Sequence, residues 1–281
     1  MLAGMQRNFS ELESVKWCPV CGVGLGKLAF SPDVARCDTC RIYYRNPRPT
    51  QNAIACSYNS GSTYRVWHEN LRDFQKLWNR RVKLVQRWSR AGRLLDIGVG
   101  DGGFLKTARA AGFDGEGTEL SDTGAAFARN ENLTIRMGQF TEMDFGANRY
   151  DVITIWHVLE HVPDPGVTLQ KIRALLNPGG FLFVAVPNEE HALLRHRLGM
   201  LPRAFEPLEF GGEIHLTHFQ PDTLKKAVKN AGFEIVRFLV DDFYPDRRYP
   251  KRFKIKAYQA MAALFRWHWA AAMICIAKPT V

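Results

Sequence analysis

Apolar residues follow two different spacings along this chain. Between residues 63 and 88, aromatic and aliphatic side chains recur every three or four positions, which predicts one long amphipathic helix. We interpret its aromatic stripe, which includes Trp67, Phe74, Trp78 and Trp88, as a packing surface. Residues 181–187 form a continuous apolar run, as expected for a strand buried on both faces of a parallel sheet. The two kinds of element together predict an α/β domain.

Two closely spaced cysteine pairs precede these elements. Cys18 and Cys21 form one C-x2-C pair, and Cys37 and Cys40 form a second pair 15 residues later. Four thiolates at this spacing are typical of a structural zinc site without an open coordination position. Redox-active pairs and buried cysteines without a metal are the alternatives. We predict a zinc ribbon and a linker over residues 1–60.

A glycine-rich turn follows a short apolar strand at residues 93–97 and precedes a predicted helix. Gly98, Gly100 and Gly103 satisfy G-x-G-x-x-G, a pattern in which missing Cβ atoms let a ligand approach backbone N–H groups. Dinucleotide dehydrogenases share this pattern. Asp96 stands two residues before the first glycine, where its charge disfavours a pyrophosphate and favours a ligand with ammonium and sulfonium groups.

With Asp96 included, this stretch resembles motif I of the class I S-adenosylmethionine-dependent methyltransferases. Glu119 falls where, in that family, the acid ending the second strand holds the ribose hydroxyls. The resemblance implies a doubly wound, seven-stranded, mostly parallel sheet that binds S-adenosylmethionine. Gln139 replaces the acid often found near the adenine, although its amide can still form hydrogen bonds. The implied cofactor-binding residues are Asp96, Gly98, Gly100, Gly102, Glu119, Gln139, Phe140 and Trp156.

Later segments are similar to the same family. Residues 150–156 resemble its fourth strand and residues 271–278 its last strand. The cysteine pairs followed by motif I resemble a bacterial architecture in which a zinc ribbon precedes a methyltransferase domain, often in glycan, deoxysugar or secondary-metabolite pathways. Arg41 departs from it, because glycine is common after the second cysteine pair. We expect a helical linker over 61–92 and the methyltransferase domain over 93–281, with acceptor-lid insertions near 189–219 and 241–269.

Histidines supply the candidates for catalysis. His157 directly follows the strand whose end borders the methyl group in the family, so we predict it as the general base, with a structural role as a cap or a wall of the cofactor pocket as the alternative. His215 and His218 follow the first insertion and are further candidates for a base or an acceptor contact. His157, Glu160 and His161 also match the protease signature H-x-x-E-H, but prolines directly after them stop the helix that it needs. Related quinone O-methyltransferases bind a divalent ion here through two acids and a histidine, which leaves a metal as an alternative.

Composition and charge bear on the partners. An apolar fraction of 46% with 23% charged residues excludes disordered and fibrous classes. The net charge of +10 favours an anionic partner. We expect a small-molecule or glycan-linked acceptor that is O- or C-methylated, with RNA methylation or a non-catalytic zinc-ribbon scaffold as alternatives. The absence of a secretory apolar run and of any 18-residue apolar stretch predicts a cytoplasmic protein with no transmembrane segment.

Overall fold

The computed structural model describes residues 11–29, 31–59, 71–190, 193, 198–199, 214–241, 260, 264 and 272–280. Most of the predicted lids, near 189–219 and 241–269, lies outside these residues, as do residues 61–70 of the predicted helical linker. Among the described helices, none combines the length and apolar character needed to cross a membrane.

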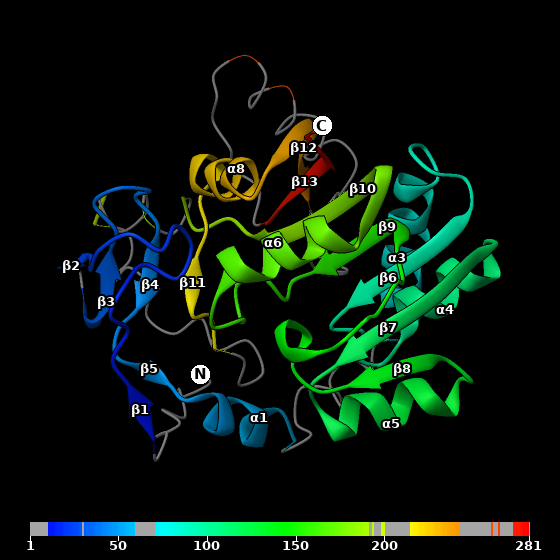
Figure 1. Ribbon diagram of the computed structural model, residues 1–281, viewed down its shortest axis with the longest axis horizontal. Coiled ribbons are helices and arrows are strands. Elements are labelled where there is room, and N and C mark those ends of the chain that lie inside the picture. The colour runs from blue at the N-terminus through cyan, green and yellow to red at the C-terminus, as the bar shows by residue number, and fades with distance from the viewer. Residues whose placement is uncertain are drawn as a thin grey trace.

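A seven-stranded sheet forms the centre of the molecule (Figure 1). Across the sheet, the strands are β12 (Phe233–Asp241), β13 (Ala272–Pro279), β10 (Leu176–Pro187), β9 (Tyr150–Trp156), β6 (Gly92–Ile97), β7 (Phe113–Glu119) and β8 (Thr134–Met137). The pairs from β10 to β8 are all parallel, and only β13 runs against its neighbours. This topology confirms the predicted doubly wound, mostly parallel α/β fold.

Helices cover both faces of the sheet. One core contains residues of α6 (Pro165–Leu175) and α8 (Pro221–Asn230), and the other contains residues of α3 (Leu71–Val85), α4 (Gly103–Ala110) and α5 (Asp122–Asn130). Side chains alternate between the two faces of each strand, so β9 contributes Ile153 and Ile155 to the first core, and Val152 and Trp156 to the second. The predicted aromatic stripe is confirmed as packing where it is described, because Phe74 and Trp78 are buried in the second core.

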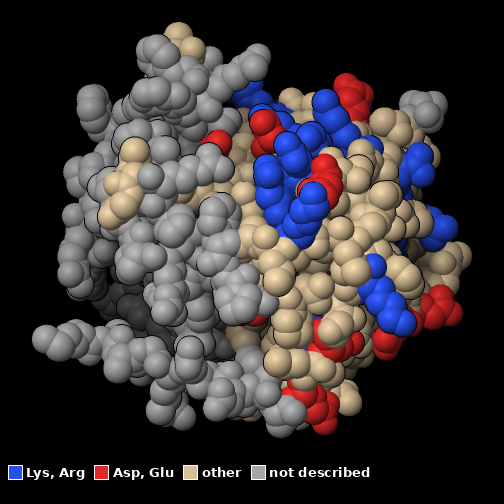
Figure 2. Space-filling view, turned by 90° about the vertical axis from the view of Figure 1, so that its left-hand side faces the viewer, with Lys and Arg blue, Asp and Glu red and all other residues tan. Residues whose placement is uncertain are grey.

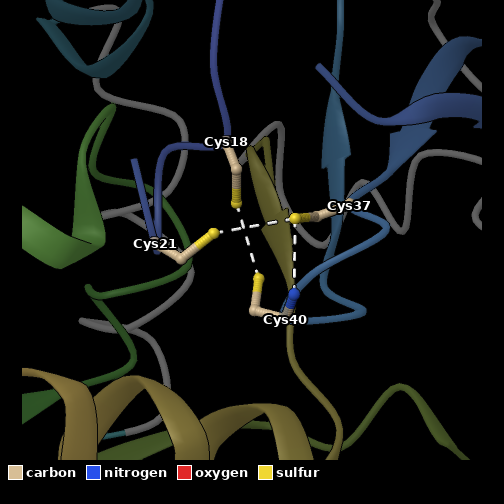
Figure 3. A group of neighbouring side chains, drawn as sticks. All are labelled: Cys18, Cys21, Cys37 and Cys40. Atoms are coloured by element: carbon tan, nitrogen blue, oxygen red, sulfur yellow. Dashed lines mark hydrogen bonds between the residues drawn. The ribbon is translucent and has the colours of Figure 1, made fainter. Parts of the chain in front are cut away.

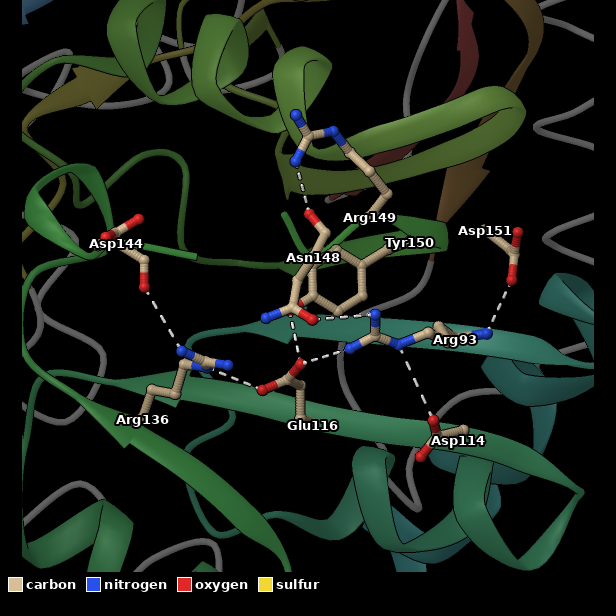
Figure 4. A network of polar contacts seen from close by, with 9 residues as sticks. All are labelled: Arg93, Asp114, Glu116, Arg136, Asp144, Asn148, Arg149, Tyr150 and Asp151. Atoms are coloured by element: carbon tan, nitrogen blue, oxygen red, sulfur yellow. Dashed lines mark hydrogen bonds and ion pairs between the residues drawn. The ribbon is translucent and has the colours of Figure 1, made fainter. Parts of the chain in front are cut away.

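A polar network links four neighbouring parallel strands, β9, β6, β7 and β8 (Figure 4). Glu116 of β7 accepts hydrogen bonds from Tyr150 of β9 at 2.6 Å and from Arg136 of β8 at 2.8 Å. Arg93 of β6 approaches the same carboxylate at 3.4 Å. Burial acts to raise the pKa of Glu116, but the hydrogen bonds from Tyr150 and Arg136 outweigh it and lower the pKa. The network therefore holds an ionised carboxylate within the sheet.

The N-terminal module has its own small sheets. Strands β2 (Lys27–Ala29), β3 (Ser31–Arg36) and β4 (Tyr43–Arg45) form an antiparallel sheet, while β1 (Leu12–Glu13) pairs with β5 (Arg48–Pro49). A fourth strand, β11 (Thr217–His218), joins the first sheet beside β4, with Thr217 opposite Tyr44 and His218 opposite Tyr43. The end of the first predicted insertion thus belongs to the sheet of the N-terminal module.

The end of the region predicted as zinc ribbon and linker, from Asn46 to Asn59, contains regular secondary structure. A cis peptide bond joins Asn46 to Pro47, and β5 follows. Helix α1 (Gln51–Asn59) begins directly after Thr50, whose hydroxyl accepts a hydrogen bond from the Ala53 N–H at 3.3 Å. At its far end, the Asn59 side chain accepts a hydrogen bond from the Asp122 N–H at the start of α5. Helix α1 therefore extends from the N-terminal module to the start of α5, beside the seven-stranded sheet.

Candidate active site and metal centres

The four cysteines of the N-terminal module converge on one point (Figure 3). Each C-x2-C pair makes the same turn: the Gly22 N–H donates to the Cys18 carbonyl at 2.9 Å, and the Arg41 N–H donates to the Cys37 carbonyl at 3.0 Å. Both residues have left-handed backbone, with φ of 70° at Gly22 and 69° at Arg41. The second turn thus imposes on an arginine the conformation that glycine adopts without strain, which explains why glycine is common there.

The sulfur positions fit a tetrahedral metal. The Sγ atoms of Cys18 and Cys40 lie 3.5 Å apart, and those of Cys21 and Cys37 lie 3.7 Å apart. Four thiolates around Zn²⁺ with bonds of about 2.3 Å are separated by roughly 3.8 Å. The hydrogen bond from Cys40 lowers the pKa of the Cys18 thiol to about 5, so one sulfur of the set is readily ionised. Both spacing and donor chemistry suit a structural zinc ion.

A cavity of about 370 Å³ opens at the carboxyl ends of β6, β7 and β9. This edge is where parallel α/β sheets bind their ligands. The cavity brings together most of the residues predicted for cofactor binding and catalysis: Gly98, Gly100, Glu119, Gln139, Phe140, Trp156 and His157. It has the size and the mixed polar and apolar lining of a small-molecule site.

Glu119 is held in a fixed orientation at this cavity. Its Oε2 accepts a hydrogen bond from the Gly100 N–H at 2.8 Å, and its Oε1 accepts from the N–H groups of Leu120 and Ser121 at 2.8 and 2.9 Å. A carboxylate only accepts hydrogen bonds, so it suits the donating hydroxyls of a ribose. Leu120 and Phe140 line the same cavity and offer apolar surface for an adenine ring. The site therefore fits the adenosyl part of S-adenosylmethionine.

Asp96 at the end of β6 and Gly102 at the start of α4 flank the glycine turn, and neither belongs to the described lining of the cavity. Asp96 is buried, and it accepts a hydrogen bond from the Thr154 hydroxyl at 2.6 Å. Burial raises the pKa of Asp96 to about 8. Gly102 has a φ of 80°, and a Cβ there would come within 2.6 Å of Leu133. Close packing against α5 and its following loop thus requires glycine at this position.

His157 lies on the cavity wall at the end of β9. It has left-handed backbone with a φ of 55°, and its N–H donates to the Ala185 carbonyl at 2.9 Å. Its Nδ1 lies 3.5 Å from Oε1 of the buried Glu160. Burial, reinforced by the positive charge of Arg81, lowers the pKa of His157 well below 6.5. The imidazole is therefore neutral at neutral pH and able to accept a proton.

His161 also lines the cavity. Its Nδ1 donates to the Ile214 carbonyl at 2.8 Å, which leaves Nε2 as the basic nitrogen, 3.9 Å from Oε1 of Glu160. Burial lowers the pKa of His161 to about 3. The segment after β9 thus places two neutral histidines on the cavity wall, with the carboxyl group of the buried Glu160 beside them.

His215 and His218 form a second group with Glu189, outside the described lining of the cavity. The Nδ1 atoms of His215 and His218 lie 3.4 and 3.6 Å from Oε1 of Glu189. Burial acts to raise the pKa of Glu189, but the two imidazoles outweigh it and lower the pKa to about 2. The ring of His215 also packs on that of His161, with centroids 4.9 Å apart. These predicted catalytic candidates therefore lie one layer behind the cavity wall.

Helix α1 is the part of the site that the sequence did not predict. Gln51, Ile54, Ala55 and Tyr58 of this helix line the cavity opposite the glycine turn. Two features of the sequence could have predicted this helix: Thr50 as its N-cap, and the apolar residues at helical spacing that follow. The prolines before Thr50 favoured a linker instead.

The fold and this site together define the class of protein: an S-adenosylmethionine-dependent methyltransferase with a Rossmann-like sheet. A family model described as a methyltransferase domain matches residues 66–237, which is more than half of the chain. The chain belongs to that family.

Curated relatives and solved structures agree with this assignment. The chain is similar to ubiquinone biosynthesis O-methyltransferases of Actinobacillus pleuropneumoniae, at 41% identity over 108 residues, and of Bordetella avium, at 32% identity over 158 residues. These matches cover 34% and 50% of this chain, and 46% and 62% of the relatives, so less than two thirds of either relative is spanned.

Among solved structures, a methyltransferase in complex with the Trm112 activator from Haloferax volcanii has a TM-score of 0.58 at 17% identity, covering 81% of this chain and 98% of that one. The CcbJ methyltransferase from Streptomyces caelestis has a TM-score of 0.53 at 18% identity, covering 73% and 90%. At these identities the likeness establishes the shared fold.

Proposed function

We propose that the protein transfers the methyl group of S-adenosylmethionine to a hydroxyl oxygen of a small-molecule acceptor. The observation that carries this proposal is His157 on the cavity wall, at the end of the strand beside the cofactor site, with the carboxyl group of the buried Glu160 3.5 Å from its Nδ1. The relatives named as O-methyltransferases support oxygen as the methylated atom. A glycan-linked hydroxyl is one form of such an acceptor, and C-methylation would use the same base on a carbon acid.

The cofactor is held by the residues that line the cavity. Glu119 binds the ribose hydroxyls, while Gly98 and Gly100 let the methionine part approach the backbone. Gln139 and Phe140 flank the adenine, and Trp156 forms the wall near the acceptor. Asp96 supports cofactor binding indirectly, because its hydrogen bond with Thr154 of β9 holds the end of β6 in place. When bound, S-adenosylmethionine supplies an activated methyl group on a positively charged sulfur.

His157 removes the proton of the acceptor hydroxyl. The acceptor oxygen forms a bond to the methyl carbon while the bond from carbon to sulfur breaks, and the hydroxyl proton passes to the neutral imidazole. The carboxyl group of Glu160 lies 3.5 Å from Nδ1 of His157, and it stabilises the imidazolium that forms when His157 takes the proton. Alignment of the acceptor supplies most of the rate enhancement, and a positioned base adds roughly 10²- to 10⁴-fold.

The four-cysteine centre holds a structural zinc ion in this proposal. Cys18, Cys21, Cys37 and Cys40 fill the tetrahedron, so no position is left for a substrate. Zinc binding supplies folding free energy to the small sheet of β2, β3, β4 and β11. The ribbon thereby fixes one side of the acceptor region.

Formation of S-adenosylhomocysteine from S-adenosylmethionine tests the function. We expect turnover with phenolic, catecholic or sugar hydroxyls in a panel of small acceptors, and a mass increase of one methyl group in one of them. His157→Ala should lower kcat roughly 10²- to 10⁴-fold while binding of S-adenosylmethionine is retained. Product formation only from RNA, or from no hydroxyl compound in a wide panel, would contradict the proposal.

The surface charge favours a small acceptor over RNA. Figure 2 shows lysine and arginine side chains gathered on one part of the described face, with acidic side chains among them. Several described lysines pair with acids, including Lys225 with Asp222 at 3.8 Å and Lys278 with Glu234 at 3.1 Å. Affinity for RNA falls steeply as salt rises. We therefore expect turnover that changes little between low and moderate salt.

A further inference from the structure

Glu189, His215 and His218 bring three ligand atoms within 4.8 Å of one another in the interior. We propose that these residues bind a divalent transition-metal ion, at a centre separate from the four cysteines. Two imidazoles and one carboxylate suit ions such as Zn²⁺, Fe²⁺ or Mn²⁺. The proposal stands independently of the methyl acceptor.

The distances favour a metal over simple hydrogen bonds. Oε1 of Glu189 lies 3.4 Å from Nδ1 of His215 and 3.6 Å from Nδ1 of His218. Hydrogen bonds between nitrogen and oxygen are usually 2.7–3.2 Å long. Ligand atoms about 2.0–2.2 Å from a tetrahedral zinc ion are separated by roughly 3.3–3.6 Å. The observed separations match neighbouring ligands of one ion better than a donor and its acceptor.

Backbone hydrogen bonds hold Glu189 and His218 in place. The Glu189 N–H donates to the Phe219 carbonyl at 2.9 Å, which fixes it beside His218. His218 belongs to β11, paired with Tyr43 of the ribbon sheet. Glu189 and His218 are only 2% and 3% exposed, so a bound ion would be shielded from bulk water. Three protein ligands would leave further coordination positions, unlike the four-cysteine centre.

A competing triad shares His215 with this one. Glu160, His161 and His215 also place ligand atoms within 4.8 Å. There, however, Nε2 of His161 lies 3.9 Å from Oε1 of Glu160, which is longer than the separation around zinc. We therefore assign the ion to Glu189, His215 and His218, next to the cavity wall formed by His161.

Metal analysis of the full-length protein, purified without chelator and loaded with Zn²⁺, tests this assignment. We expect two zinc ions per chain in the wild type and one in Glu189→Gln or His218→Ala. The matched control is Glu160→Gln, which removes the carboxylate of the competing triad and should keep two ions. Loss of an ion from Glu160→Gln with two ions retained in Glu189→Gln would overturn the assignment.

Cobalt substitution of the wild type provides a readout that does not depend on how the variants fold. Co²⁺ in the four-cysteine centre gives thiolate charge-transfer bands, whereas Co²⁺ bound by histidine and carboxylate gives ligand-field bands without them. We expect a second equivalent of Co²⁺ to add only ligand-field intensity. A wild-type spectrum that saturates with thiolate charge-transfer bands alone would overturn the proposal.

Discussion

Asp96→Asn should change how the stability of the protein depends on pH. Asp96 is fully buried behind the glycine turn, and its Oδ1 accepts a hydrogen bond from the Thr154 hydroxyl at 2.6 Å. Asparagine has nearly the same shape and keeps an oxygen that accepts this bond. It differs in remaining neutral at every pH. The substitution therefore isolates the electrostatic cost of the carboxyl group.

The magnitude follows from the raised pKa. Burial raises the pKa of Asp96 from 3.8 to about 8, so the carboxyl ionises in the unfolded chain at a much lower pH than in the folded one. The unfolded state therefore binds fewer protons between pH 4 and pH 8, and the free energy of unfolding falls as the pH rises through this window. At about 1.36 kcal/mol per pKa unit, the full loss is on the order of 5 kcal/mol.

Chemical denaturation of wild type and Asp96→Asn at several pH values measures this difference. We expect equal stability near pH 4 and a more stable variant at pH 8, with the gap opening steadily between them. Asp114→Asn is the matched control, because the Asp114 side chain is 84% exposed, and it should follow the wild type throughout. Parallel pH profiles for wild type and Asp96→Asn would refute the reasoning.

Three further predictions concern the site and the ribbon. Glu119→Ala should weaken S-adenosylmethionine binding about 10- to 100-fold in calorimetry, since hydrogen bonds to a charged group contribute about 1.5–3 kcal/mol; Glu131→Ala, on the surface, should not. Because the pKa of His157 is lowered, kcat should hold from pH 8 to pH 6 and fall only at lower pH; a loss centred near pH 6.5 would contradict this. Left-handed backbone costs a non-glycine residue about 1–2 kcal/mol. Arg41→Gly should therefore make zinc harder to remove with a chelator, and Gly22→Ala should make it easier to remove. Equal zinc loss from the two variants would refute this prediction.

The sequence predicted those parts of the protein that short, local patterns encode. The cysteine pairs, the glycine turn and Glu119 are each defined within a few residues, and the structure brings the four thiolates together and places the turn and Glu119 at one cavity. The sheet was predictable because buried parallel strands are continuous apolar runs. By contrast, whether Asp96 faces the ligand or the core depends on strand packing, and the structure shows its hydrogen bond to Thr154 on the neighbouring strand.

The pairing of β11 with β4 could not be predicted from the sequence, because it depends on contacts between distant segments. Strand β11 is only two residues long, too short for a recognisable periodicity in the sequence, yet its pairing with β4 joins the four-cysteine module to His218. His218 lies opposite Tyr43, three residues after Cys40. Because a small metal-bound module folds as a unit with its metal, emptying the four-cysteine centre should release β11 and displace His215 and His218 together. Replacing Cys18 and Cys21 with serine, which leaves Glu189, His215 and His218 intact, should therefore reduce methyl transfer while S-adenosylmethionine binding at Glu119 is retained. Equal loss of both would mean that the four-cysteine centre stabilises the whole chain.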